Sequence, residues 1–303
     1  MKKIAIGAWA FEEFKNPGDL YRNVKSLGFD GICMGANIAP EDYDTDEKKE
    51  ELKKLIFTNK LQVPEYGIDV YGAHALLDSK EWLRLAKRNI EFADSLGFTR
   101  ILRVDTGVPP KMPNGMKYSQ VKDFYKDAFR IIAEKAKQYG MTVVWEFEPG
   151  FILNEPENVI EVVKDVNMNN FKLEFDCCHA YNCAVAGLGS LEEGKTLEGG
   201  ILEFIKLCKG LIGMVHLIDT DGTVVNVGID IKGENGETAQ LITSKHSQFG
   251  KGFLNFDEIV PALLHEAEYN GEWWVMDMEL TPFAEVEKNY NFVKALNEKY
   301  CCE

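Results

Sequence analysis

Four acidic or imidazole side chains stand near the ends of successive strand-like segments in the second half of the chain. These residues are Glu148, Asp176, His216 and Glu279. The carboxyl ends of the parallel strands of an α/β barrel all open onto one face, so the four side chains would converge there. Carboxylate oxygens and one imidazole nitrogen suit a hard to borderline cation. The pattern therefore predicts a site for one divalent ion, with Mn²⁺ favoured over Mg²⁺, Co²⁺ or Zn²⁺.

The elements that must position these side chains are apolar, strand-like runs that alternate with amphipathic stretches. The runs are 3–9, 28–36, 65–72, 99–107, 141–150, 171–179, 212–222 and 273–280. Eight such units predict a (β/α)8 TIM barrel that forms a single domain over residues 1–303. A doubly wound sheet is the alternative, but it would usually carry a glycine-rich phosphate loop, and the sequence has no GxGxxG or Walker motif.

The stretches between the runs have helical periodicity and end signals. In 79–97, Trp82, Ala86 and Ile90 recur at helical spacing, Ser79 is placed as the N-cap, and Gly97 ends the segment. The stretches 122–140, 254–271 and 284–300 follow the same pattern.

Two connections are longer than the rest, after the sixth and the seventh strand. They cover residues 180–210 and 220–253. Loops of this length are usually functional or disordered, and in a barrel they lie at the catalytic face. Within the second, 223–231 alternates, and 234–237 (ENGE) and 238–242 (TAQLI) follow it. This pattern predicts a hairpin that lies over the site.

Strand alternation predicts a deeper layer of charge. Glu146, Glu174 and Asp277 each stand two residues before one of the predicted ligands, so they share its face of the strand. Buried carboxylates need partners. We expect Arg103, on the fourth strand, to point into the barrel and meet Glu174 and Asp277 there.

Composition excludes several classes of protein. The formal net charge is −15, whereas nucleic-acid binders carry a basic surface. No segment has the length and apolarity of a membrane span or a signal peptide, so we expect a cytoplasmic protein. The seven cysteines are odd in number and include no CxxC, which favours reduced thiols, with Cys177 and Cys178 as packing residues.

Five segments together resemble the xylose-isomerase-like barrel superfamily, which contains sugar isomerases and epimerases such as D-tagatose 3-epimerase and inosose dehydratase. They are WEFEPG with Glu148, LEFDCCHA with Asp176 and His179, MVHLIDTDG with His216, VMDMEL with Glu279, and FGKGFLNFDEIV. The likeness covers nearly the whole chain.

The resemblance implies a metal-dependent isomerase or epimerase that acts on a keto sugar or aldose through an enediolate. Glu148 and Glu279 would be both metal ligands and the acid/base pair, Asp176 and His216 would be ligands only, and His179 would hydrogen-bond a substrate hydroxyl. Three further residues are candidate substrate contacts. They are His74 after the third strand, His246 late in the long second connection, and Trp9 at the end of the first strand.

Three alternatives remain open. The long connection after the seventh strand departs from compact epimerases and is compatible with a related lyase that cleaves 3-keto-glycosides, including C-glycosides, together with a small second subunit. An endonuclease-IV-like repair enzyme would need more histidines and a basic surface. A barrel without activity would have lost part of its ligand set. The expected partners are accordingly a small carbohydrate and a second copy of the chain or the small subunit, with no nucleic acid and no membrane.

Overall fold

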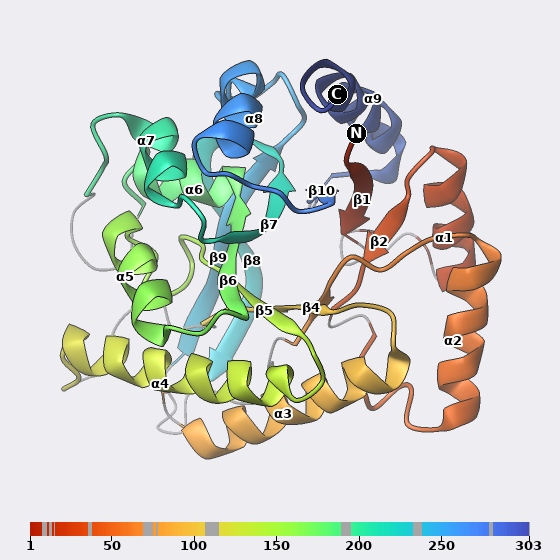
Figure 1. Ribbon diagram of the computed structural model, residues 1–303, viewed down its shortest axis with the longest axis horizontal. Helices are drawn as coiled ribbons and strands as arrows, with labels where there is room; N and C mark the ends of the chain where they lie inside the picture. Colours follow the sequence, from red (N-terminus) through yellow and green to blue (C-terminus); the bar gives the residue numbers. More distant parts are fainter. Residues whose placement is uncertain are drawn as a thin grey trace.

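A computed structural model describes residues 1–7, 11, 14, 16–35, 38–68, 75–76, 78–106, 115–188, 195–232, 238–278 and 281–302, without the side chains of 227–241. Eight parallel strands form a nearly closed barrel with helices between them (Figure 1). The strands are β1 (Lys3–Gly7), β2 (Gly31–Cys33), β3 (Tyr66–Gly67), β4 (Ile101–Val104), β5 (Thr142–Glu146), β6 (Phe171–Asp176), β7 (Ile212–Leu217) and β10 (Trp273–Met276). The predicted (β/α)8 barrel is confirmed.

The first and last barrel strands close the sheet. Its order is β2-β1-β10-β7-β6-β5-β4-β3, and β1 pairs in parallel with β10. At the open edge, β2 and β3 are joined by single parallel bridges, one of which links Met34 to Tyr66. The carboxyl ends of all eight strands therefore face the same end of the barrel.

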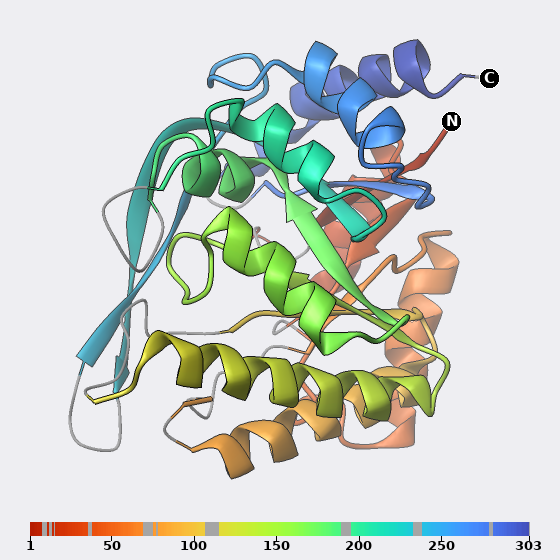
Figure 2. The ribbon, with the colours of Figure 1, turned by 60° about the vertical axis from the view of Figure 1, so that its left-hand side comes forward.

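Helices surround this barrel on its outer side (Figure 2). They are α1 (Pro17–Ser26), α2 (Asp46–Thr58), α3 (Ser79–Leu96), α4 (Tyr118–Lys137), α5 (Pro156–Val166), α6 (Cys177–Ala184), α7 (Gly200–Leu207), α8 (Phe256–His265), the short 3₁₀ helix η2 (Phe283–Glu285) and α9 (Val286–Tyr300). Gly97 ends α3 in the left-handed conformation, as predicted. The N-cap of α3 is Asp78 and not Ser79, because the Asp78 side chain accepts the hydrogen bond from the backbone N–H of Glu81. Among the described residues, no helix has both the length and the apolar character that a membrane span requires.

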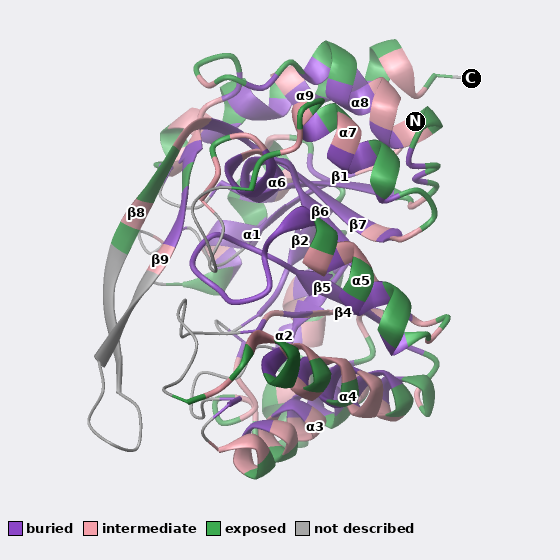
Figure 3. Cartoon of the chain, turned by 90° about the vertical axis from the view of Figure 1, so that its left-hand side faces the viewer, coloured by how far each residue is buried: buried purple, intermediate pink, exposed green. Residues whose placement is uncertain are grey.

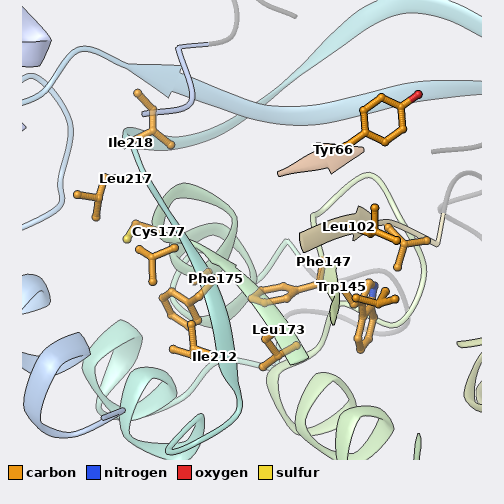
Figure 4. Packing of buried hydrophobic residues seen from close by; sticks show 14 of the residues in the cluster. Tyr66, Leu102, Trp145, Phe147, Leu173, Phe175, Cys177, Ile212, Leu217 and Ile218 are labelled. Carbon is orange, nitrogen blue, oxygen red and sulfur yellow. The ribbon is translucent and has the colours of Figure 1, made fainter. Parts of the chain in front are cut away.

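Aromatic packing fixes which side chains of β5 and β6 face inward. Phe147 and Phe175 lie between the strands and the helices, with ring centroids 5.4 and 5.5 Å from that of Phe204 on α7 (Figure 4). Since neighbouring side chains on a strand point to opposite faces, the acidic residues beside these phenylalanines turn away from the helices.

The connection after β7 is a hairpin, as predicted. Its strands β8 (Asp219–Lys232) and β9 (Thr238–Ser247) pair antiparallel and form a long ribbon along one side of the barrel (Figure 3). Gly150 allows this ribbon to approach closely, since a Cβ on Gly150 would lie 1.5 Å from the carbonyl oxygen of Ile242. The other long segment, 180–210, contains most of α6 and all of α7.

One buried carboxylate ties the base of the hairpin together. Asp219, at the start of β8, accepts hydrogen bonds from its neighbour Thr220 and from three backbone N–H groups after β9. Those three groups belong to Gly250, Gly252 and Leu254, at distances of 2.9 to 3.1 Å. Asp219 therefore connects the beginning of the hairpin to the chain that leaves it.

Replacement of Asp219 should destabilise the protein. Asp219→Ala leaves the buried N–H groups of Thr220 and Leu254 without this acceptor, and hydrogen bonds to charged groups contribute about 1.5–3 kcal/mol each, so we expect a loss of about 3 kcal/mol in the free energy of unfolding. Urea denaturation measures this loss. Asp221→Ala is the matched control, since Asp221 pairs at the surface with Lys245 and should cost at most about 1 kcal/mol. Equal losses in both variants would contradict the assigned role of Asp219.

Candidate metal centre and active site

The imidazole of His216 on β7 lies between two groups of buried carboxylates. Its Nε2 is 3.0 Å from Oε1 of Glu65 and 3.1 Å from Oε1 of Glu174. Its Nδ1 is 3.8 Å from Oε1 of Glu146 and 3.8 Å from Oδ2 of Asp277. Glu65 thus fixes one edge of the ring, while the other edge faces the second pair of carboxylates.

Four buried residues on the Nδ1 side form a candidate metal centre. Glu146, Asp176, His216 and Asp277 each offer a ligand atom, and these atoms all lie within 4.8 Å of one another. Two of the oxygens indicate a cation site. Oε1 of Glu146 and Oδ2 of Asp176 are buried without a hydrogen-bond partner. Buried carboxylate oxygens normally have partners, and a divalent ion would supply one here. The residues present therefore fit a metal.

Asp176 has two roles at the junction of β6 and α6. Its Oδ1 accepts a hydrogen bond of 2.8 Å from the backbone N–H of His179 and so caps α6, which leaves Oδ2 for the centre. Because of this cap, the chain enters a helix directly after Asp176. His179 accordingly lies in the first turn of a helix and not, as predicted, where the strand opens into a loop.

The structure brings Asp176 and His216 together, as predicted, but with Glu146 and Asp277 beside them. The reason is strand length. β5 ends at Glu146 and β10 ends at Met276, directly before Asp277, so these are the carboxylates at the strand ends. Glu279 lies outside the described residues, as do two predicted substrate contacts, Trp9 and His74.

Glu148 lies beside this centre and contacts the hairpin. Its Oε2 accepts a hydrogen bond of 2.8 Å from Oγ1 of Thr243 on β9 and is 3.9 Å from Nε2 of His179. Glu148 is 8 % exposed. It is therefore positioned next to the four-residue group and not within it.

His179 and His246 complete the wall of the site. His179 Nδ1 forms a 2.8 Å hydrogen bond with Oγ of Ser244, and its Nε2 is 3.7 Å from Oε1 of Glu146. His246 Nδ1 is 3.8 Å from Oδ1 of Asp277. Both histidines thus face the carboxylates, and the hairpin does lie over the site. Their substrate contacts remain predictions.

Arg103 points into the barrel, as predicted, and Nη1 donates a hydrogen bond of 2.9 Å to Oε2 of Glu146. The expected single layer of Arg103, Glu174 and Asp277 is not formed. Glu174 lies on the Nε2 side of His216, whereas Asp277 lies on its Nδ1 side. The imidazole separates the two carboxylates.

Burial determines the charge states within the site. It raises the pKa of Asp176 and of Glu174 well above their usual values and also raises the pKa of Glu146, despite the nearby Arg103. Burial also opposes ionisation of Asp277, but the facing His246 and His216 outweigh it and hold the pKa of Asp277 below its usual range.

The surroundings of His216 favour its charged form. Burial disfavours its charged form, yet Glu174 and Glu65 outweigh this effect and hold the pKa of His216 well above its usual value. Burial and the nearby His246 lower the pKa of His179 well below its usual value, and the opposite effect of Asp277 does not offset them. In the absence of a metal, the protonated His216 therefore compensates part of the carboxylate charge.

Sequence reasoning missed Glu65, Thr243 and Ser244. Glu65 lies in VPEYG, directly before β3. An acidic residue at the start of a buried strand was the only sign in the sequence that Glu65 could belong to the site. Thr243 and Ser244 lie in a hairpin whose register could not be read from the sequence. Cys177 (Figure 4) and Cys178 both lie in the apolar core cluster, as predicted. All seven cysteines are free.

Comparison with known proteins identifies the family and finds solved structures with the same fold. The family described as xylose isomerase-like TIM barrel matches residues 21–296. A D-tagatose 3-epimerase-like protein superposes with a TM-score of 0.70 at 19% identity, covering 98% of each chain. The IOLI protein, whose crystal structure contains a zinc atom, superposes with a TM-score of 0.71 at 18% identity, covering 98% of this chain and 99% of that one.

One curated relative matches only part of the chain. The uncharacterized protein MJ1311 of Methanocaldococcus jannaschii is 27% identical over 157 residues, which span 50% of this chain and 42% of that protein. The match to the family, in contrast, extends over nearly the whole barrel. The chain belongs to the xylose isomerase-like TIM barrel family.

Proposed function

We propose that this protein is a divalent-metal-dependent sugar isomerase or epimerase. The observation that carries the proposal is the group formed by Glu146, Asp176, His216 and Asp277, in which one oxygen each of Glu146 and Asp176 is buried without a hydrogen-bond partner. Membership of the xylose isomerase-like family and the likeness to a D-tagatose 3-epimerase-like protein support a carbohydrate substrate.

The four residues of this group would hold the metal, with Glu146 in the place predicted for Glu148. The role of Glu279 as a ligand stays a prediction, because Glu279 lies outside the described residues. When bound, a divalent cation would polarise the substrate carbonyl and stabilise the negative charge of an enediolate. Three carboxylates and one imidazole suit Mn²⁺, and the alternatives Mg²⁺, Co²⁺ and Zn²⁺ remain.

Glu65 would position the metal ligand. With a metal on Nδ1 of His216, the contact of Glu65 with Nε2 would keep the ring proton on Nε2 while Nδ1 faces Glu146 and Asp277. Carboxylates that hold the second nitrogen of a ligating histidine orient the ring and raise its basicity. Glu65 is therefore a positioning residue in this proposal.

Glu148 would move the proton of the substrate C–H. As its carboxylate lies beside the metal group without belonging to it, Glu148 can accept a proton while the four ligands stay in place. Thr243 holds one of its oxygens by a hydrogen bond, which fixes the carboxylate toward the site. Glu279 remains the predicted second acid/base residue, and His179 and His246 would hydrogen-bond substrate hydroxyls through ring nitrogens that face the carboxylates.

Proton exchange tests this function directly. In D₂O with Mn²⁺, wild type should exchange a substrate C–H for deuterium in a panel of ketoses, aldoses and 3-keto-glycosides followed by NMR. Glu148→Gln should slow the exchange by at least about 100-fold, because it removes the proton acceptor, while metal content stays unchanged.

The products decide the reaction type. An epimer or isomer establishes the isomerase reaction, whereas release of the aglycone from a 3-keto-glycoside establishes the lyase alternative suggested by the long segment after β7. Wild-type exchange that Glu148→Gln leaves at full rate would contradict the role of Glu148. Thr106→Ser, a conservative change outside the centre in a hydrogen bond to the carbonyl of Ile152, is the control and should exchange normally.

The metal-free protein should lose stability as the pH rises. Glu174 is buried and its pKa is raised, so the folded state retains a proton that the unfolded state releases. Stability is therefore full below the unfolded pKa near 4.3 and falls as the pH rises through the folded pKa, by up to about 1.4 kcal/mol per pH unit.

Glu174→Gln should flatten this dependence, because glutamine is neutral at every pH. Urea denaturation in EDTA at pH 5 and pH 7.5 measures the difference. Asp176 contributes a slope of the same sign, so the variant retains part of the dependence. Glu272→Gln, on the surface, is the control and should retain the whole slope. A Glu174→Gln slope as steep as that of wild type would refute the prediction.

A further inference from the structure

We propose that Cys178, His179 and His246 form a second metal site, which takes a borderline or soft cation such as Zn²⁺. The three residues are buried, and each offers a ligand atom that lies within 4.8 Å of the other two. This group shares no residue with the carboxylate-rich centre, and it goes beyond the function proposed above.

The site connects two elements that are far apart in the sequence. Cys178 and His179 lie in the first turn of α6, and His246 lies on β9 of the hairpin. The thiol of Cys178 is 3.8 Å from the carbonyl oxygen of Lys245, next to His246, and the two imidazole centroids are 5.7 Å apart. A cation bound here would join the hairpin to the barrel.

His246 provides an independent indication of a ligand. Its side chain is 1 % exposed, and neither ring nitrogen has a hydrogen-bond partner. The carboxylate of Asp277 is 3.8 Å away, beyond hydrogen-bond distance. A buried imidazole without a partner is costly, and a metal ion would provide the missing interaction.

The donor set differs from that of the first centre and selects a different ion. One thiolate and two imidazoles favour Zn²⁺ or Co²⁺, whereas three carboxylates and one imidazole favour Mn²⁺ or Mg²⁺. Zn–S and Zn–N bonds are about 2.3 and 2.0 Å, so tetrahedral ligand atoms lie roughly 3.5 Å apart. A movement of the hairpin toward α6 would bring His246 closer to the other two ligands, while side-chain rotations on α6 would adjust Cys178 and His179.

Both sites can be occupied together. An imidazole has two nitrogens, so His179 can bind the second cation through Nδ1, which would exchange its hydrogen bond with Ser244 for the metal, and keep Nε2 for substrate or for the carboxylates. Glu146 lies 3.7 Å from its Nε2, so a cation at the second site would also lie close to a group rich in negative charge. Thr243 and Ser244 precede His246 on β9, so the second cation would hold the hairpin against Glu148 and His179.

Titration of the EDTA-treated full chain with Co²⁺ tests this proposal. We expect two equivalents per chain and a thiolate-to-cobalt charge-transfer band in the near ultraviolet. Cys178→Ser should abolish the band and one equivalent. His246→Gln should weaken the affinity of that equivalent by at least about tenfold, since even the loss of an outer hydrogen-bond partner does so.

Two matched variants distinguish binding at this site from binding at the neighbouring thiol or at the first centre. Cys177→Ser changes the neighbouring thiol, which does not belong to the group of Cys178, His179 and His246, and should keep both the band and the stoichiometry. Asp176→Asn weakens the first centre and should lose its equivalent while keeping the band, so the two proposals fail independently. Circular dichroism of each variant verifies folding. A wild type that shows no charge-transfer band at saturating Co²⁺, or a band that persists in Cys178→Ser, would overturn the proposal.

Discussion

The contacts of His216 govern the catalytic end of this barrel. One edge of its ring meets Glu65 and Glu174 at hydrogen-bond distance, and the other edge faces Glu146 and Asp277. Burying several carboxylates in a protein interior is unfavourable unless cations or hydrogen-bond donors compensate for them. Arg103 and His216 supply part of that compensation within the chain, and a divalent cation would supply the rest. The metal would then be as much a requirement of the fold as of the reaction.

The hairpin after β7 converts this open end of the barrel into an enclosed site. Three nearby residues of β9 contact residues in or beside the centre: Thr243 bonds Glu148, Ser244 bonds His179, and His246 faces Asp277. Gly150 lets the hairpin backbone lie directly on the loop after β5, and Asp219 holds its base. In the proposed function, substrate access and the orientation of Glu148 would therefore depend on this hairpin, which also carries a ligand of the proposed second metal site.

Much of this architecture was predictable from the sequence, because it depends on periodicity. The apolar runs predicted the barrel strands, and alternation within them correctly turned Glu146, Glu174 and Arg103 inward. The residue at which each strand ends was harder to predict from the sequence. β5 stops at Glu146, two residues before the carboxylate that the motif suggested, because backbone pairing determines the strand end and the side-chain pattern does not. Glu65 and Ser244 depend on long-range contacts with His216 and His179, which local sequence does not encode.

The central claim is that Glu146, Asp176, His216 and Asp277 bind a divalent ion. The most direct measurement is a crystal structure of the protein soaked with Mn²⁺, with an anomalous difference map calculated from data collected at the manganese edge. The claim predicts a peak within about 2.0–2.2 Å of one oxygen from each of the three carboxylates and of Nδ1 of His216. A peak coordinated by Glu148 in place of Glu146, or a centre without any peak at saturating Mn²⁺, would contradict it.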